Sequence, residues 1–175
     1  MFPGADTFTT IGEDMPATAT TKTQRLGEPL WFLHNLSRIL VSGEEGENRF
    51  SLVDMTGAPG DMPQLHVHHD EDETFYVLDG ELELHIAGRE PVRVAPGRAA
   101  FAPRAVPHAY RVTSPRAAHW LVACTGRSFA GLVRDTSVPA ETATLPVDRQ
   151  FDPEEITAIS ARNGIEILGP PGTLP

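Results

Sequence analysis

The sequence of 175 residues predicts one all-β domain, an antiparallel sandwich or barrel followed by one or two short helices. Short apolar or alternating runs recur from Leu30 to roughly Thr125. Between them lie turn-forming residues, and the chain holds 15 glycines and 16 prolines. The pair Asp79-Gly80, between two alternating runs, is typical of a tight hairpin. Many short strands at this spacing are typical of β-sandwiches and barrels.

The runs that we expect to form strands follow one another in this order: residues 31–33, 39–41, 50–55, 74–78, 82–86, 92–94, 99–102 and 118–124. A first short helix is expected after Ser128, where apolar residues share one face. A second helix is marked by Asp152 as N-cap, Pro153 at its first position and Gly164 just past its end.

These elements imply the boundaries of the domain. Residues 1–25 are poor in large apolar side chains, so we expect a flexible leader, with an interface-lining arm as the alternative. The domain itself is expected over residues 26–168, with the barrel at about 30–125 and the helices at about 128–164. Residues 169–175 are expected to be a tail.

Composition excludes several classes of function. With 24 acidic and 14 basic residues, the formal net charge is −10, which argues against binding nucleic acid or an anionic membrane surface. The single cysteine, Cys124, excludes internal disulfides and cysteine-based metal clusters, and we expect it to be buried. Lys22 is the only lysine available for Schiff-base chemistry. There is no targeting signal and no apolar stretch of ~20 residues, so a cytoplasmic location is expected.

Charge is unevenly distributed along the chain. Residues 51–95 carry most of the acids of the barrel, and residues 96–134 carry arginines and no acid. One interpretation is that the two segments lie side by side and neutralise each other. The other is that the arginines line an opening for an anionic or enolate substrate.

Three histidines and one glutamate form the chemically informative pattern. His66 and His68 are two residues apart, so on a strand both side chains leave the same face. Glu73 begins the next run and shares a face with Phe75, where an ionised carboxylate needs a compensating cation or donors. His108 begins a later strand. Three imidazoles and a carboxylate form a mixed N/O donor set suited to one divalent transition metal, namely Fe, Mn, Ni, Co, Cu or Zn.

The spacing Gly60-x5-His66-x-His68-x4-Glu73-x6-Gly80, followed by Gly97-x5-Pro103-x4-His108, resembles the two paired motifs of the cupin superfamily. The resemblance covers roughly residues 30–135. Residues 73–80 and 107–111 are most similar to single-domain bacterial cupins of the quercetin 2,3-dioxygenase-like type. The resemblance implies a double-stranded β-helix, which is the jelly-roll barrel of the cupin superfamily.

Carried over residue by residue, the metal ligands of the family fall on His66, His68, Glu73 and His108. The sequence departs from the pattern at two positions that are not ligands. Val112 stands where the second motif often has asparagine, and Ala105 stands where the loop commonly has glycine.

The resemblance also implies a function: a metal-dependent dioxygenase of flavonol-like or other enolisable aromatic or polyketide molecules, with dioxygen as co-substrate. Glu73 would be both ligand and general base. The candidate substrate-binding residues are Phe75, Val77, Phe101, Tyr110 and Trp120. Two alternatives stay open: a non-redox isomerase, cyclase or decarboxylase with the same metal, and a metal- or ligand-binding cupin without turnover.

The remaining polar residues are assigned to the surface. Residues 69–72, which include Glu71, are expected to form a solvated turn, and His34, His85 and His119 are expected at strand surfaces or edges. A homodimer is expected, in which residues 31–33 could pair across a two-fold axis.

Overall fold

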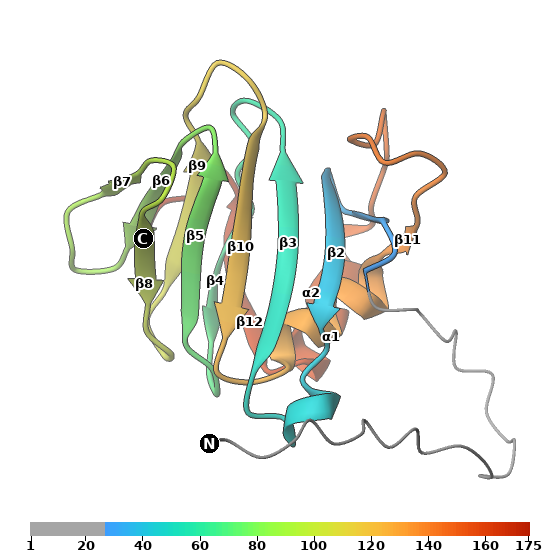
Figure 1. Cartoon of the computed structure of the whole chain (residues 1–175). Helices are drawn as coiled ribbons and strands as arrows, with labels where there is room; N and C mark the ends of the chain where they lie inside the picture. Colours follow the sequence, from blue (N-terminus) through green and yellow to red (C-terminus); the bar gives the residue numbers. More distant parts are fainter. Residues whose placement is uncertain (1–26) are drawn as a thin grey trace, which may run out of the picture.

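Within residues 27–175, which the computed structural model describes, twelve strands form two antiparallel sheets that face each other (Figure 1). The first sheet has the order β11-β1-β2-β3-β10-β5-β8. Its strands are β11 (Val138–Pro139), β1 (Leu30–Phe32), β2 (Asn35–Val41), β3 (Ser51–Gly57), β10 (Ala118–Cys124), β5 (Glu73–Asp79) and β8 (Ala99–Ala102). The leader expected over residues 1–25 lies outside the described residues.

The second sheet has the order β12-β4-β9-β6-β7. Its strands are β12 (Ile165–Pro171), β4 (Gln64–His68), β9 (His108–Val112), β6 (Leu82–Ile86) and β7 (Val92–Val94). A short 3-10 turn, Glu44–Gly46, links β2 to β3. The predicted all-β jelly-roll architecture, with two short helices after the main strands, is confirmed.

The core lies between the two sheets. Alternate residues of β3 and β10 are buried, as the two-residue period of a strand requires when one face is covered. Trp120, in the middle of β10, has no exposed surface, and Val53 on β3 and Leu84 on β6 are equally buried. The apolar residues of the predicted runs therefore supply the driving force for sheet packing.

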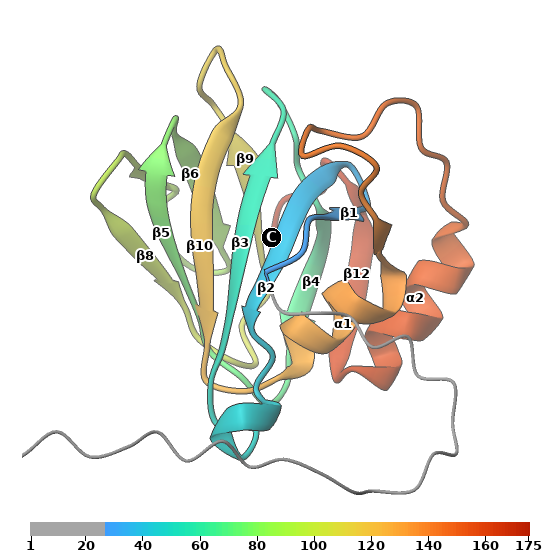
Figure 2. The ribbon, with the colours of Figure 1, turned by 45° about the vertical axis from the view of Figure 1, so that its right-hand side comes forward.

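Two helices cover one side of the sandwich, next to β2 and β12 (Figure 2). These are α1 (Ser128–Thr136) and α2 (Pro153–Arg162). The predicted start of α2 is confirmed, because the side chain of Asp152 accepts a hydrogen bond from the backbone N–H of Glu154 at 2.9 Å. Gly164 follows the helix with a φ of +71°, in the left-handed region that favours glycine.

Two expectations about the strands are wrong. The tail expected from residue 169 begins later, because β12 continues to Pro171 and pairs with β4. Its prolines are tolerated since β12 is the edge strand of its sheet. In addition, β1 is not free to pair across a two-fold axis along this edge, because it lies between β2 and β11 of the same chain. The homodimer stays a prediction.

Among the described residues, no helix has the length and apolar character needed to cross a membrane.

Candidate metal centre

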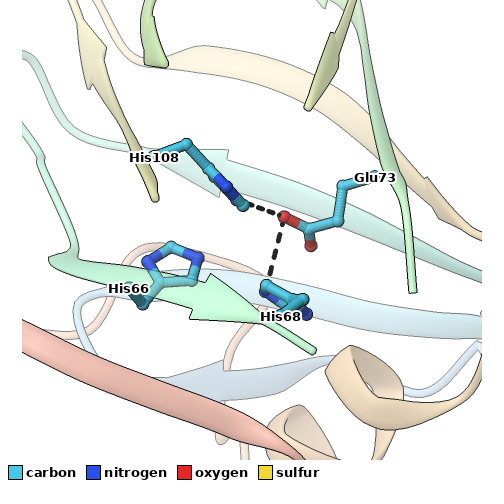
Figure 3. Close-up of side chains that lie close together, drawn as sticks. All are labelled: His66, His68, Glu73 and His108. Carbon is cyan, nitrogen blue, oxygen red and sulfur yellow. Dashed lines mark hydrogen bonds and ion pairs between the residues drawn. The ribbon is translucent and has the colours of Figure 1, made fainter. Parts of the chain in front are cut away.

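Strands from both sheets bring His66, His68, Glu73 and His108 together between them (Figure 3). His66 and His68 leave the same face of β4, and His66 lies opposite His108 in the register of β4 with β9. Glu73 reaches the same point from β5 in the opposite sheet. The nitrogen and oxygen atoms that these four side chains offer all lie within 4.8 Å of one another.

The carboxylate of Glu73 lies closest to two of the imidazoles. Its Oε2 is 2.8 Å from Nε2 of His108 and 3.5 Å from Nε2 of His68. His68, Glu73 and His108 are each only 1% exposed. Three of the four ionisable groups are therefore almost completely buried, where charge must be compensated locally.

Each imidazole has a hydrogen-bond partner at Nδ1, the ring nitrogen on the side away from the centre of the cluster. For His66 and His108 the acceptors are the backbone carbonyls of Gln64 and Val106, at 2.7 and 3.0 Å. For His68 the partner is the carboxylate of Glu71, at 2.9 Å. Because a carbonyl can only accept, the Nδ1 atoms of His66 and His108 donate, so that Nε2 is the nitrogen that each ring would offer to a metal at the common centre.

This arrangement fits a bound cation. Nε2 of His68 is fully buried and has no hydrogen-bond partner among the described residues. Such atoms are uncommon in folded proteins, and a cation at the centre would satisfy it. Three imidazole nitrogens and one carboxylate form a donor set that suits the first-row transition metals, and the structure does not select one of them.

The electrostatics of the cluster favour positive charge beside Glu73. Burial, reinforced by His108 and His68, lowers the pKa of His66 to about 3, so this ring is neutral. Burial alone would raise the pKa of Glu73, but the neighbouring His68 and His108 lower it to about 2. Burial likewise disfavours the charged form of His68, yet Glu73 and Glu71 raise its pKa overall. A proton on His68 or a bound cation can supply the compensating charge.

Glu71 corrects the prediction of a solvated turn. It is 1% exposed, and its carboxylate accepts hydrogen bonds from the backbone N–H groups of Ser128 and Phe129 at 2.9 and 2.6 Å, besides contacting His68. A Cβ at Gly126 would come within 2.8 Å of Glu71 Oε2, so only glycine lets the chain pass so close. Glu71 thus joins the first turn of α1 to a member of the cluster.

The sequence does not distinguish Glu71 from its neighbours, because residues 70–72 are all acidic and differ only in their position relative to α1. Asp70 is exposed. Asp72 forms a surface ion pair with Arg104 at 2.8 Å, and hydrogen bonds from Arg104 lower the pKa of Asp72 to about 2. The one available signal was the position of Glu71 three residues after a candidate ligand, within reach of its Nδ1.

A cavity of about 280 Å³ opens onto the cluster, with His66, His68 and Glu73 in its wall. Most of the other lining residues are apolar. They come from both sheets, including β12, and from α1 and α2. This volume is close to the lower end of the range of about 300–1,000 Å³ that is common for small-molecule sites. The cavity can therefore admit a small organic molecule beside the cluster.

Of the candidate substrate-binding residues, Phe75, Tyr110 and Trp120 line this cavity, whereas Val77 and Phe101 do not. Val77 is fully buried in the core. Phe101 is 49% exposed on the outer face of β8, because its neighbours in the strand alternation, Ala100 and Ala102, point inward. The expectation that Val77 and Phe101 line the pocket is wrong.

The other singled-out side chains are not among the four clustered residues, although Sγ of Cys124 lies 3.7 Å from Oε1 of Glu73. His34 does line the cavity, with its ring 5.0 Å from that of Phe151. His69, His85 and His119 pair with acidic residues, at 3.1, 3.1 and 2.8 Å. Cys124 is buried as expected, and burial together with Glu73 raises its pKa well above the usual value, so it is not a reactive thiolate.

The arginine-rich segment does not form an opening of the cavity. No arginine is among the cavity-lining residues in the described part of the chain. Arg111 instead lies opposite Glu83 in the pairing of β9 with β6, and Arg104 pairs with Asp72. The interpretation that the acidic and basic segments neutralise each other agrees with these contacts.

Comparisons with known proteins agree with the fold and the cluster. Residues 53–124 match the cupin domain family, and this span runs from β3 to β10 and includes all four clustered residues. The chain therefore contains a cupin domain, and the resemblance expected from the motifs is confirmed.

Quercetin 2,3-dioxygenase of Bacillus subtilis (strain 168) is 36% identical over 90 residues, which cover 51% of this chain and 26% of that protein. The chain thus spans about a quarter of the length of this curated relative.

Two solved structures are similar to parts of the chain. Oxalate decarboxylase of Lactobacillus farciminis, a formate complex, aligns with a TM-score of 0.50 and 16% identity, over 57% of this chain and 31% of that one. The protein TT1209 of Thermus thermophilus aligns with a TM-score of 0.43 and 36% identity, over 46% and 75% of the two chains. The first alignment supports the fold and carries no information on the reaction.

Proposed function

We propose that this protein is a metal-dependent cupin enzyme, a dioxygenase of a flavonol-like or other enolisable aromatic or polyketide molecule. The observation that carries the proposal is the donor set. Three imidazoles, each with a hydrogen-bond partner at Nδ1, and the carboxylate of Glu73 form one cluster, and His66, His68 and Glu73 line an apolar cavity. The similarity to a quercetin 2,3-dioxygenase supports the choice of an oxygenase.

In this proposal His66, His68, Glu73 and His108 hold one divalent transition metal. When bound, a redox-active metal supplies Lewis acidity toward a substrate hydroxyl and a path for electrons to dioxygen. Glu73 is ionised at neutral pH because the imidazoles lower its pKa. It accepts the hydroxyl proton at Oε2, the oxygen that faces the imidazoles, because Oε1 lies 3.7 Å from Sγ of the buried Cys124.

Loss of that proton leaves an electron-rich enolate for dioxygen to oxidise. The apolar wall has two tasks here: it packs against the substrate rings, and it keeps water away from the reactive enolate. Phe75 provides aromatic surface for these tasks, since it lines the cavity and its ring lies 6.4 Å from that of His108.

The test is metal analysis of the purified protein, followed by reconstitution with Fe, Mn, Ni, Co, Cu or Zn and measurement of dioxygen uptake with a panel of flavonols. We expect uptake with a redox-active metal and none in Glu73→Gln. Glu90→Gln, which changes an exposed glutamate, is the matched control and should behave like the wild type.

Other outcomes assign the site to a different class. Turnover with Zn and no dioxygen uptake would contradict the dioxygenase and favour an isomerase, cyclase or decarboxylase. Complete inactivity of fully metal-loaded protein would favour a cupin that binds a metal or ligand without turnover.

A further inference from the structure

A second polar cluster lies in the same cavity, formed by Asp61, Tyr110 and Asn35. Oδ2 of Asp61 accepts a hydrogen bond from the hydroxyl of Tyr110 at 3.1 Å and another from Nδ2 of Asn35 at 2.8 Å. All three residues line the cavity. Neither Asp61 nor Asn35 belongs to the metal-ligand set.

The backbone fixes this cluster in place. The N–H of Asp61 donates to the carbonyl of Ala58 at 3.0 Å, and the carbonyl of Asp61 accepts from the N–H of Val112 at 2.9 Å. The side chains are tightly packed as well, because a Cβ at Gly57 would lie 2.8 Å from Nδ2 of Asn35 and 3.0 Å from Oδ2 of Asp61. The carboxylate of Asp61 is therefore oriented before any ligand enters.

One acceptor atom of the second polar cluster, Oδ1 of Asp61, is available for a ligand. Tyr110 donates its only hydroxyl proton to Oδ2 of Asp61, so the hydroxyl has no second proton to offer to a ligand. Oδ1 of Asp61 accepts no hydrogen bond from the described residues, yet it is not one of the fully buried atoms. Because Asp61 is a lining residue of the cavity, this oxygen can accept a hydrogen bond from a ligand.

The charges of the cavity restrict that ligand. Asp61 and Glu73 are its acidic lining residues, and no lysine or arginine of the described chain lines it. A carboxylate or phosphate on the ligand would face Asp61 without a compensating cation, which is unfavourable away from bulk water. A neutral ligand with a hydroxyl donor has no such cost.

The position of the second polar cluster relative to the four candidate metal ligands also suits an aromatic ligand. Tyr110 follows His108 by two residues on β9, so their Cα atoms are about 6.6 Å apart on one face of the strand. The ring of Phe75 lies 6.4 Å from that of His108 and 6.1 Å from that of Tyr110. An apolar wall thus connects the two polar ends of the site.

We propose that Asp61, oriented by Tyr110 and Asn35, accepts a hydrogen bond from a second hydroxyl of a neutral aromatic substrate whose reacting hydroxyl lies at Glu73. This inference rests on the proposed function, because it assumes that the substrate binds beside the metal cluster. It makes Asp61 a residue that determines substrate specificity.

The experiment measures binding without turnover. Protein loaded with redox-silent Zn is titrated calorimetrically, in the absence of dioxygen, with 3-hydroxyflavone and with isomers that carry one additional phenolic hydroxyl. The same isomers are then tested as methyl ethers and with a carboxylate in place of the added hydroxyl. We expect one added hydroxyl to tighten binding about tenfold or more, since a hydrogen bond to a charged group is gained. Its methyl ether and its carboxylate analogue should lose that gain.

Variants assign the effect to Asp61. Asp61→Asn should remove the gain, measured as the ratio of the Kd of 3-hydroxyflavone to that of the hydroxylated isomer within the same variant, so that a general effect on binding cancels. Asp79→Asn, at an exposed aspartate at the end of β5, is the matched control and should keep the gain. Metal content and Tm are measured for each variant. The methyl-ether comparison needs no variant and stands if Asp61→Asn fails to fold.

The proposal is wrong if no added hydroxyl improves binding, if the methyl ether or the carboxylate analogue binds as tightly, if Asp61→Asn keeps the preference, or if no flavone binds. Failure of the proposed function looks different. A hydroxyl preference that depends on Asp61, without dioxygen uptake by any metal form, would refute the dioxygenase and leave this binding site in place. Dioxygen uptake without a hydroxyl preference would refute only this inference.

Discussion

Replacing Glu71 by alanine removes a buried carboxylate that holds together a turn, a helix and a candidate metal ligand. The side chain contacts Nδ1 of His68 at 2.9 Å and accepts from the backbone N–H groups of Phe129 and Ser128 at 2.6 and 2.9 Å. Alanine has no carboxylate, so all three donors lose their partner. They lose it in a buried site, because Glu71 itself is only 1% exposed. A buried donor without a partner costs about 1–3 kcal/mol.

The three losses do not simply add, because water can enter the space and because the carboxylate no longer has to be desolvated. Breaking a buried charged network by removing one partner typically costs about 3–5 kcal/mol, and we expect the free energy of unfolding to fall by this amount. Metal affinity should fall about 10- to 100-fold, since the ring of His68 loses the partner that orients it.

The assay is urea unfolding followed by tryptophan fluorescence, which reports on the buried Trp120, together with metal titration against a competing chelator. Asp70→Asn is the control, because Asp70 is an exposed acid of the same turn, and its effect should stay within about 0.5 kcal/mol. If Glu71→Ala unfolds at the same urea concentration and binds metal as tightly as the wild type, the role assigned to Glu71 is refuted.

Glu73→Gln should reduce dioxygen uptake far more than metal content, because an amide can still coordinate weakly but cannot accept a proton; equal uptake by the variant would show that Glu73 is not the base. His66→Ala should lower the metal-to-protein ratio measured by elemental analysis, and full metal content would remove His66 from the ligand set. Phe101→Ala should leave the Kd of 3-hydroxyflavone unchanged, since Phe101 is 49% exposed on the outer face of β8. A higher Kd in this variant would show that Phe101 contacts the ligand. The pKa of Asp72 is lowered to about 2 by Arg104, so this pair stabilises the fold above the unfolded pKa of about 3.9 and loses that contribution as pH falls toward 2. Asp72→Asn should flatten acid unfolding curves in that window, and an unchanged curve would contradict the assignment.

His66, His68 and Glu73 could be found in the sequence because their spacing is local, and His108 because it belongs to the second of the two motifs that resemble those of the cupin superfamily. The two-residue period of a strand places His66 and His68 on one face, and the short turn after them returns the chain at Glu73. The cap of α2 at Asp152 is equally local, since it involves a residue two positions away. Such features depend on neighbours along the chain, so pattern reasoning can identify them.

Other features depend on contacts between distant segments. Which acid of residues 70–72 is buried depends on the position of α1, more than fifty residues later in the chain. The hydrogen bonds of Asp61 also depend on distant segments, because its partners Asn35 and Tyr110 come from strands of different sheets. The face on which Phe101 lies is set by the pairing of β8 with β5, and the alanine-rich run around it carries little apolar alternation to reveal it.

By itself, the sequence determined the all-β class, the identity of the clustered histidines and glutamate, and the resemblance to the cupin superfamily. The tertiary structure decided which polar side chains surround that cluster, which aromatic residues line the cavity and where the last strand ends. The physical reason is that strand periodicity and turns are encoded within a few residues. Burial and hydrogen bonding of a side chain depend on segments that meet only when the two sheets and the helices pack together.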